Sequence, residues 1–189
     1  KANCFSFSAP TSTGKSFVFR NLIEKGANDT VVVVPSRALI NEYYLRLCEL
    51  MPDKSINILT FIDKINTAKA KRNIFVVTPE RCRDLFKQKD NFNVDLFLFD
   101  EPCSAMDIKY QKEFFKLAEK TKKQNGNSIL ITIHDINLAV QNCDRIILLY
   151  EGRILYDGPS DEISCEVLSK AFDVKVSMEK QYSKKYFYY

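Results

Sequence analysis

The sequence predicts an α/β fold: a three-layer domain whose central sheet is mainly parallel. Short apolar runs alternate with longer helical patterns along most of the 189 residues, and this alternation indicates βαβ units. Several runs are apolar throughout, which is typical of parallel strands with helices on both faces of the sheet. Two short apolar runs flank a Gly-containing turn within residues 148–156, and they predict a hairpin at one edge of the sheet.

The elements follow one another with short connections. The expected strands cover residues 4–7, 31–34, 56–60, 74–78, 96–99, 129–133 and 146–149. The expected helices cover residues 15–24, 37–50, 79–87, 108–123, 135–142 and 161–172. Ser160 or Asp161 is expected near the N-cap of the last helix. Residues 180–189 are rich in Lys and Tyr, and we expect a frayed segment or a point of truncation there.

Composition and charge restrict the class of protein. A length of 189 residues and a hydrophobic content of 46% suit a single globular domain, residues 1–189. The chain has no apolar run long enough to cross a membrane and no signal peptide, so we expect a cytoplasmic protein without membrane insertion. The six cysteines show no CxxC spacing, most of them sit in apolar patterns, and they are expected to be reduced, small core residues. A net charge of +4 permits contact with nucleic acid without requiring it.

The first motif follows the first expected strand and precedes the first expected helix. Its residues are Ala9, Pro10, Thr11, Ser12, Thr13, Gly14, Lys15 and Ser16. A strand, loop and helix of this kind is a P-loop, here with Ala in place of the first Gly, and its backbone N–H groups hold phosphates. Thr11, Ser12, Thr13, Gly14, Lys15 and Ser16 are therefore the candidate nucleotide-binding residues. Lys15 would reach the β- and γ-phosphates and assist catalysis, and Ser16 would bind Mg²⁺. The alternative is a Ser/Thr-rich turn before a helix.

The second motif ends an apolar strand. Residues 95–99 are followed by two carboxylates, Asp100 and Glu101. Ligands of open α/β sheets bind beyond the carboxyl ends of the strands, so both side chains should emerge beside the P-loop. Asp100 is the candidate Mg²⁺ ligand, and Glu101 is the candidate base that polarises the attacking water. The alternative is a solvated acidic turn.

From Ser8 to Glu101 the chain resembles the first RecA-like domain of superfamily-2 (DEAD/DEAH-type) helicases. Besides the P-loop and Asp100-Glu101, the segments that carry this resemblance are residues 35–42 and 78–81. In that family the two latter motifs contact the backbone of a single strand. The resemblance therefore implies contacts of Arg37, Thr78 and Arg81 with single-stranded RNA or DNA, which suits the bidentate pairing of Arg with phosphate. Solvated residues at helix starts are the alternative for both arginines.

From residue 99 to about Val176 the chain resembles ABC-transporter ATPases, nearest in character to the importer ATPases for iron chelates and cobalamin. The segments that carry this resemblance are residues 100–107, 131–139, 143–154 and 157–159. It implies that His134 contacts the γ-phosphate and orients the attacking water, although a lone His is more often a core or surface residue. For Asp107 it implies a loop that faces a second subunit, and an N-cap for the next helix is the alternative.

Neither resemblance is complete. The helicase-like segment, residues 1–101, lacks a Ser-Ala-Thr motif after Glu101 and a second RecA-like domain with its arginine finger. The ABC-like segment, residues 102–189, lacks the Leu-Ser-Gly-Gly-Gln signature and the Gln-loop, which argues against a permease partner. Both families place the strand at 129–133 between the P-loop strand and the Asp-Glu strand. A hybrid joined at residues 99–101 would keep one sheet topology, so the sequence suggests a chimera.

Three functions are consistent with these motifs. The first is an ATP- and Mg²⁺-binding P-loop NTPase core that hydrolyses ATP slowly and contacts single-stranded nucleic acid weakly. The second is the ATP-binding subunit of an ABC transporter. The third is a hybrid that folds and binds nucleotide without catalytic turnover. ATP as the nucleotide is implied by the resemblance, because the sequence itself shows no base-reading motif.

Overall fold

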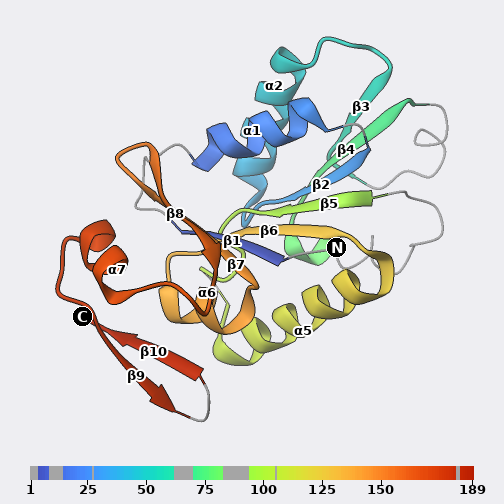
Figure 1. Cartoon of the computed structure of the whole chain (residues 1–189). Helices are drawn as coiled ribbons and strands as arrows, with labels where there is room; N and C mark the ends of the chain where they lie inside the picture. The colour runs from blue at the N-terminus through green and yellow to red at the C-terminus, as the bar shows by residue number, and fades with distance from the viewer. Residues whose placement is uncertain are drawn as a thin grey trace.

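One eight-stranded sheet forms the centre of the molecule in a computed structural model that describes residues 4–8, 15–26, 28–61, 70–82, 94–104, 106–181 and 184–189. The strand order is β3-β4-β2-β5-β6-β1-β7-β8 (Figure 1). In chain order the strands are β1 (Cys4–Ser8), β2 (Asp29–Val33), β3 (Ile56–Leu59), β4 (Arg72–Val77), β5 (Val94–Phe99), β6 (Ser128–Thr132), β7 (Arg145–Tyr150) and β8 (Arg153–Pro159). All neighbouring strands except β7 and β8 pair in parallel, which confirms the mainly parallel sheet.

The expected order at the centre of the sheet is confirmed. Strand β6 pairs with β1 on one side and with β5 on the other. The three strands are parallel, so their carboxyl ends lie at the same edge of the sheet. The end of β5, which precedes Asp100, therefore lies at the same edge as the end of β1, which precedes the P-loop motif in the sequence.

The edge hairpin of β7 and β8 is also confirmed. The two strands pair antiparallel from Arg145↔Pro159 to Tyr150↔Arg153. The turn between them is made by Glu151 and Gly152, whose φ angles of 48° and 73° are both positive. Two central residues in the left-handed region match the right-handed twist of the flanking strands, which is why this turn favours Gly.

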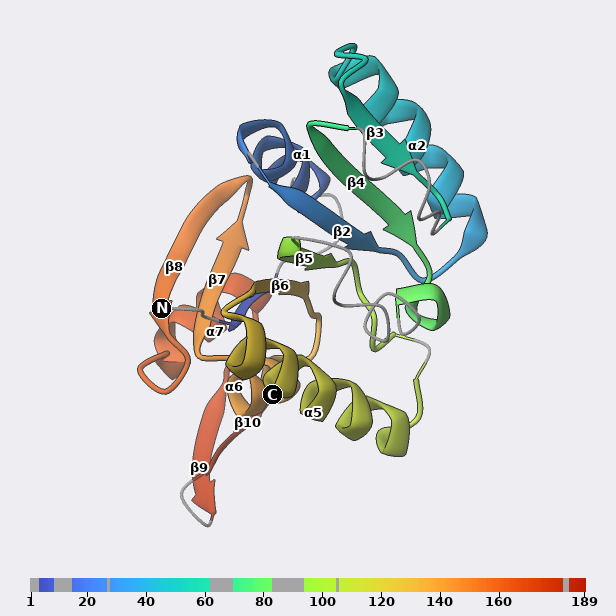
Figure 2. The same cartoon turned by 90° about the vertical axis from the view of Figure 1, so that its right-hand side faces the viewer.

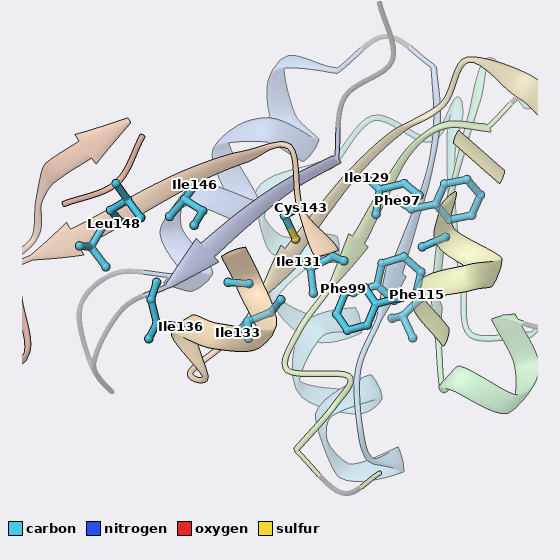
Figure 3. Packing of buried hydrophobic residues seen from close by; sticks show 14 of the residues in the cluster. Phe97, Phe99, Phe115, Ile129, Ile131, Ile133, Ile136, Cys143, Ile146 and Leu148 are labelled. Carbon is cyan, nitrogen blue, oxygen red and sulfur yellow. The ribbon is translucent and has the colours of Figure 1, made fainter. Parts of the chain in front are cut away.

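Helices cover both faces of the sheet (Figure 2). Helices α1 (Lys15–Lys25) and α2 (Arg37–Leu50) pack on one face, around a buried cluster that includes Phe19, Leu47 and Leu98. Helices α5 (Ile108–Asn125), α6 (Ile136–Asn142) and α7 (Cys165–Phe172) contribute to a second cluster on the other face. Figure 3 shows that cluster, in which Phe99 lies beside Phe115 and Ile131. The three-layer α/β arrangement is thus confirmed.

The helix starts show local capping. Ser36, Asp107, Asp135 and Ser164 each accept hydrogen bonds from backbone N–H groups in the first turn of the helix that follows. The Asp107 carboxylate accepts from Tyr110 N at 3.0 Å, which is the capping alternative considered for that residue. The N-cap expected at Ser160 or Asp161 is wrong. Helix α7 begins at Cys165, because the Ser164 hydroxyl caps it, and Ser160 instead donates its backbone N–H to Asp144.

The carboxyl-terminal segment is ordered into a second sheet, so the expectation of a frayed tail is wrong. Strands β9 (Ser177–Gln181) and β10 (Lys184–Tyr188) pair antiparallel as a hairpin. Phe187 is 2% exposed and belongs to the same buried cluster as α6. The Lys- and Tyr-rich composition of this segment gave no indication that Phe187 would be buried. Of the helix expected at 79–87, only residues 79–82 lie within the described residues, and they are helical.

A buried arginine joins α1, β2 and β4 at the amino-terminal ends of these strands, the edge of the sheet opposite Asp100. Arg72 begins β4 and is 4% exposed. Its guanidinium donates to Ile23 O and Asn28 O, both at 2.6 Å, and to Thr30 Oγ1 at 2.9 Å. Because Ile23 lies in the last turn of α1, this side chain fixes the carboxyl end of that helix against β2.

Candidate functional site

The candidate site lies at the carboxyl edge of the central strands. The register places Thr132, the last residue of β6, beside Phe7 of β1. Strand β5 ends at Phe99, and Asp100 continues the ladder by donating its N–H to Val33 O at 2.8 Å. Asp100 therefore leaves the sheet next to Thr132, two strands from the end of β1.

The Asp100 carboxylate is held by hydroxyl groups from two different elements. Tyr43, on α2, donates its O–H to Oδ2 of Asp100 at 2.9 Å. Thr132, on β6, donates to Oδ1 at 2.9 Å. Tyr43 and Thr132 are 7% and 1% exposed, so the hydroxyls approach from the protein interior. The carboxylate consequently has a fixed orientation at the end of its strand.

Glu101 adopts an uncommon backbone conformation. Its φ angle is 47°, in the left-handed region that favours glycine and costs a residue with a side chain on the order of 1 kcal/mol. Its N–H donates to Thr132 Oγ1 at 2.7 Å, which holds the peptide in this position. The same hydroxyl thus orients both Asp100 and Glu101. The turn directs the Glu101 side chain toward β6 and away from the path of a continuing strand.

Glu101 and His134 form a close pair. His134 Nε2 lies 2.6 Å from Glu101 Oε1, and the two side chains are 44% and 31% exposed. With Glu101 ionised, Nε2 is the protonated nitrogen, because a carboxylate only accepts hydrogen bonds. Both residues line a pocket of about 190 Å³ together with Cys103, Ser104 and Leu138. A carboxylate and an imidazole beside one solvent-filled space can orient a water molecule and accept a proton from it.

The loop after Glu101 forms one wall of that pocket. Ser104 donates its hydroxyl to Glu101 O at 2.9 Å, and Gln111 of α5 donates to Met106 O at 3.1 Å. Cys103 also lines the pocket, where burial, assisted by the neighbouring Asp135 carboxylate, raises the pKa of its thiol to about 11. The thiol therefore stays protonated at neutral pH and acts as a small apolar wall residue.

The sequence-predicted nucleotide-binding residues are only partly described. Thr11, Ser12, Thr13 and Gly14 lie outside the described residues. The backbone of Lys15 and Ser16 forms the first turn of α1, whereas their side chains lie outside the described part. The amino-terminal end of an 11-residue helix follows β1 here, and such an end favours anions.

The donors present fit a magnesium ion. Asp100 supplies carboxylate oxygens, the hard ligands that Mg²⁺ takes in phosphate-binding sites. Its two oxygens each accept one hydroxyl hydrogen bond and retain further lone pairs for a cation. Among the described residues, no group of three or more His, Cys, Asp or Glu side chains is arranged to hold a metal by itself. This arrangement suits an ion whose remaining ligands are water and phosphate.

The candidate nucleic-acid residues lie at the same edge of the sheet. Arg37 is the first residue of α2 and is exposed. Thr78 directly follows β4, and its carbonyl accepts from Cys82 N at 2.9 Å. Arg81 is exposed, but its Nη1 donates to Thr60 O at 2.6 Å, so part of that guanidinium already has a partner. The two arginines therefore sit on neighbouring surface segments, beyond β2 and β4.

Sequence reasoning missed Tyr43 and Thr132. Tyr43 occupies an apolar position of an amphipathic helix and its hydroxyl gives no pattern of its own. Thr132 is the one polar residue in the apolar run 129–133, and such a residue is a signal that could have been used. Both donate to Asp100 across long stretches of sequence, 57 positions for Tyr43 and 32 for Thr132, which no local pattern shows.

Two further expectations can be compared with the described residues. Cys82 and Cys143 are buried as expected, but Cys48 is exposed, and all five described cysteines are free. Within the described helices, none is long and apolar enough to cross a membrane.

Curated relatives of the chain include ATP-binding proteins of importers. The hemin import ATP-binding protein HmuV of Rhodopseudomonas palustris (strain BisA53) is 33% identical over 84 residues, which are 44% of this chain and 31% of that protein. The petrobactin import ATP-binding protein FpuC of Bacillus anthracis is 33% identical over 94 residues, which are 49% of this chain and 35% of that protein. The chain spans about a third of the length of these curated relatives.

Solved structures share the fold. An inward-facing metal-chelate type ABC transporter matches with a TM-score of 0.61 at 13% identity, covering 98% of this chain and 84% of that chain. CbiO1 from Clostridium perfringens, part of the ABC transporter complex CbiONQ, matches with a TM-score of 0.53 at 15% identity, covering 85% of this chain and 78% of that chain. At such identities the likeness shows the fold alone.

The model of one protein family matches well over half of the chain. It is the DEAD/DEAH box helicase family, and the match covers residues 2–133. This match extends beyond the junction expected at residues 99–101, so it overlaps the segment in which the ABC-type motifs occur. The chain is therefore a P-loop NTPase that belongs to the DEAD/DEAH box helicase family and that also resembles ABC-transporter ATPases.

Proposed function

We propose that this chain binds Mg-ATP and hydrolyses it slowly at the carboxyl edge of β1, β5 and β6. The observation that carries the proposal is the arrangement of Asp100, Glu101 and His134 around one buried threonine. Two adjacent acidic residues are oriented by Thr132, and the second of them pairs with the only histidine of the chain. A solvated acidic turn would not need this set of contacts.

Each residue has a distinct part in the proposed reaction. Lys15 and Ser16, at the start of α1, bind the phosphates together with the loop formed by Thr11, Ser12, Thr13 and Gly14. Asp100 and Ser16 hold Mg²⁺, which supplies charge neutralisation at the phosphates. Glu101 accepts the proton of the attacking water.

His134 orients that water and keeps the Glu101 carboxylate in place. Because His134 donates from Nε2 to Oε1, the second carboxylate oxygen of Glu101 is the one expected to face the water. The pocket of about 190 Å³ beside both residues provides space for water molecules. Holding the water close to the γ-phosphate converts hydrolysis into an attack of fixed geometry.

Hydrolysis is proposed to be slow because the resemblance implies that a second module is needed. Helicases of this type supply an arginine finger from a second RecA-like domain, and ABC ATPases supply a signature loop from a second subunit. An arginine finger contributes roughly 10³–10⁵ in rate. The charge that develops on the phosphates is only partly balanced by Lys15 and Mg²⁺ in this chain alone.

The helicase-like half is proposed to contact single-stranded RNA or DNA weakly. Arg37 and Arg81 are both exposed and lie on segments that follow β2 and β4. Such contacts go to phosphate, are independent of sequence and weaken as salt rises. The bond from Arg81 to Thr60 O reduces what that guanidinium can offer, so Arg37 is proposed to contribute most.

The test is steady-state Mg-ATP hydrolysis with and without single-stranded RNA or DNA. Lys15→Ala provides the blank, and Glu101→Gln tests the proposed base. Turnover that disappears in both variants supports the proposed site. Stimulation by nucleic acid that is lost in Arg37→Ala supports the strand contact. A wild-type rate equal to that of Lys15→Ala would reduce the protein to a hybrid that binds nucleotide without turnover.

A second candidate is the ATP-binding subunit of an ABC transporter. It is favoured by the identity of 33% to import ATP-binding proteins and by the shared fold. The absence of the Leu-Ser-Gly-Gly-Gln signature and the Gln-loop from the sequence opposes it. Copurification with a permease would support this candidate, whereas stimulation by single strands would support the first.

A further inference from the structure

The carboxyl-terminal hairpin is attached to α6 by one side chain that pairs with main chain as a β-strand would. Asn137 Nδ2 donates to Phe187 O at 2.9 Å, and Phe187 N donates to Asn137 Oδ1 at 2.7 Å. Asparagine can make this reciprocal pair because its amide carries one donor group and one acceptor in the same plane, as a peptide does. The other edge of β10 pairs with β9.

The attachment is local and apolar at its centre. Phe187 is 2% exposed and packs in the cluster that contains Ile136 and Ala139 of α6. By contrast, every residue of β9 is exposed. The hairpin thus extends from the body of the protein and contacts it chiefly through β10 (Figure 1). A second polar contact joins the Lys185 ammonium to Asp161 O.

Helix α6 is the element that follows His134. Only Ile133, His134 and Asp135 separate the end of β6 from the first residue of the helix. The Asp135 carboxylate accepts hydrogen bonds from Asn137 N at 2.8 Å and Leu138 N at 3.1 Å. The backbone of Asn137 therefore supports the turn that carries His134, while its side chain holds the hairpin. Leu138 lines the pocket beside Glu101 and His134.

We propose that the β9–β10 hairpin acts as a positioning element for the His134–Glu101 pair, through Asn137. A helix of seven residues has little stability of its own, so its orientation depends on what packs against it. The hairpin supplies Phe187, whose main chain makes two hydrogen bonds with Asn137, the second residue of α6. The buried ring of Phe187 packs in the same cluster as α6. When Asn137 releases Phe187, α6 and the preceding turn gain freedom, and the approach of His134 Nε2 to Glu101 Oε1 is weakened.

The chain contains a single histidine, so the imidazole signals in an NMR spectrum report on His134 without ambiguity. The experiment compares the ring Cε1–H and Nε2 signals at fixed pH in the wild type, Asn137→Ala and Asn142→Ala. Glu101→Ala supplies the reference position for a separated pair. Asn142 is the matched control, because it lies on the same helix and its amide donates to Leu138 O within that helix.

We expect the His134 signals of Asn137→Ala to move toward those of Glu101→Ala, while those of Asn142→Ala stay at the wild-type position. Asn137→Asp keeps the acceptor for Phe187 N but loses the donor to Phe187 O, so an intermediate shift is expected. Hydrogen exchange of the amides in β10 verifies that the hairpin has been released. If Asn137→Ala does not release it, the double variant Asn137→Ala/Phe187→Ala is used in its place. Released β10 with unchanged His134 signals would overturn the proposal.

A turnover assay gives a second test, which rests on the proposed ATPase function, whereas the NMR comparison does not. In a turnover assay, Asn137→Ala is expected to lower kcat by about 10-fold with little change in the KM for ATP, because misplacement of a reacting group affects the chemical step. A protein without any turnover contradicts the proposed function but leaves the NMR comparison intact. A lowered kcat with unmoved His134 signals would contradict the positioning role.

Discussion

His134 Nε2 lies 2.6 Å from Glu101 Oε1, although the two residues are 33 positions apart in the sequence. The approach depends on the pairing of β5 with β6, which brings the ends of the two strands to the same edge of the sheet. It also depends on the left-handed conformation of Glu101, which turns the side chain toward β6. The pair is therefore a product of the fold and of one strained residue.

Replacing Glu101 and replacing His134 should lower turnover by different factors. Glu101→Gln removes the proposed proton acceptor, so we expect kcat to fall at least 10²-fold with the KM for ATP nearly unchanged. His134→Ala leaves the carboxylate in place but unsupported, and a smaller loss of roughly 10-fold is expected. Steady-state hydrolysis measures both. Equal effects of the two variants would indicate that His134 itself takes part in the proton transfer.

Thr132 is expected to be as important to the site as the residues that react. Thr132→Val keeps the shape of the side chain but leaves the Glu101 N–H without its acceptor and Asp100 without one donor. We expect a loss of about 1–3 kcal/mol in the free energy of unfolding. Turnover should fall as well, because both carboxylates lose their orientation. Urea denaturation and steady-state hydrolysis measure the two effects.

Thr132→Ser provides the matched control, since it retains the hydroxyl and removes only the methyl group. It should preserve most of the turnover that Thr132→Val loses. If the two variants lose turnover equally, the methyl packing of Thr132 matters more than its hydrogen bonds, and the orienting role assigned to the hydroxyl is wrong.

Tyr43→Phe should weaken the binding of magnesium while leaving the fold intact. Its hydroxyl donates to Asp100 Oδ2, and residues that orient a metal ligand typically contribute about 10–100-fold to metal affinity. We expect the Mg²⁺ concentration for half-maximal turnover to rise about 10-fold. Tyr44→Phe is the control, because the neighbouring tyrosine is exposed. An equal response of both variants would contradict the role of Tyr43.

Much of the sheet could be predicted because buried parallel strands have a continuous apolar pattern. Residues 96–99 and 129–133 could be predicted as strands for this reason. The two families that the motifs resemble implied only that the strand at 129–133 lies between the P-loop strand and the Asp-Glu strand, not the order of the remaining strands. The β9–β10 hairpin could not be predicted from the sequence. It depends on the burial of Phe187 against α6, a contact between segments 50 residues apart that no local pattern shows.

The acidic residues and His134 were predictable as chemistry, but their supports were not. Asp100, Glu101 and His134 each follow an apolar run, which makes them visible in the sequence. Tyr43 looks like an ordinary apolar-face residue of α2, and the partner of its hydroxyl, Asp100, lies 57 positions away in the sequence. The conformation of Glu101 was also invisible, because residues other than Gly and Asn rarely adopt a positive φ.

Arg72 should be required for stability and dispensable for the site. Its guanidinium donates three hydrogen bonds at the amino-terminal end of β4, the edge of the sheet opposite Asp100. A lysine cannot reproduce this planar set of donors, so Arg72→Lys should lower the free energy of unfolding by about 2–3 kcal/mol. Urea denaturation measures the loss, and the KM for ATP should not change.

Arg46→Lys is the control for Arg72, because Arg46 is half-exposed and pairs with Glu42 at the surface. Its effect should stay within about 0.5 kcal/mol. If Arg72→Lys is equally mild, the carbonyl groups of Ile23 and Asn28 find other donors and the anchoring role of Arg72 is wrong.

Cys103 should make the free energy of unfolding fall as the pH becomes alkaline. Burial, assisted by Asp135, raises the pKa of its thiol to about 11 in the folded protein, whereas a thiol in an unfolded chain titrates near about 8.5. Between these values the unfolded chain has released its proton and the folded protein has not. The contribution to stability is therefore fully present below about pH 8.5 and is lost as the pH rises toward 11.

The variant Cys103→Ala isolates this contribution, because buried Cys82, whose pKa burial also raises, adds a loss of the same sign in both proteins. Free energies of unfolding measured at pH 7.5 and pH 10, two conditions chosen on either side of the unfolded-state value of about 8.5, give the dependence for each protein. Wild type should lose more stability than Cys103→Ala across this interval. Equal losses would mean that the Cys103 thiol ionises in the folded protein as readily as in the unfolded chain. The wall of the pocket beside Glu101 would then admit the solvent that a thiolate needs.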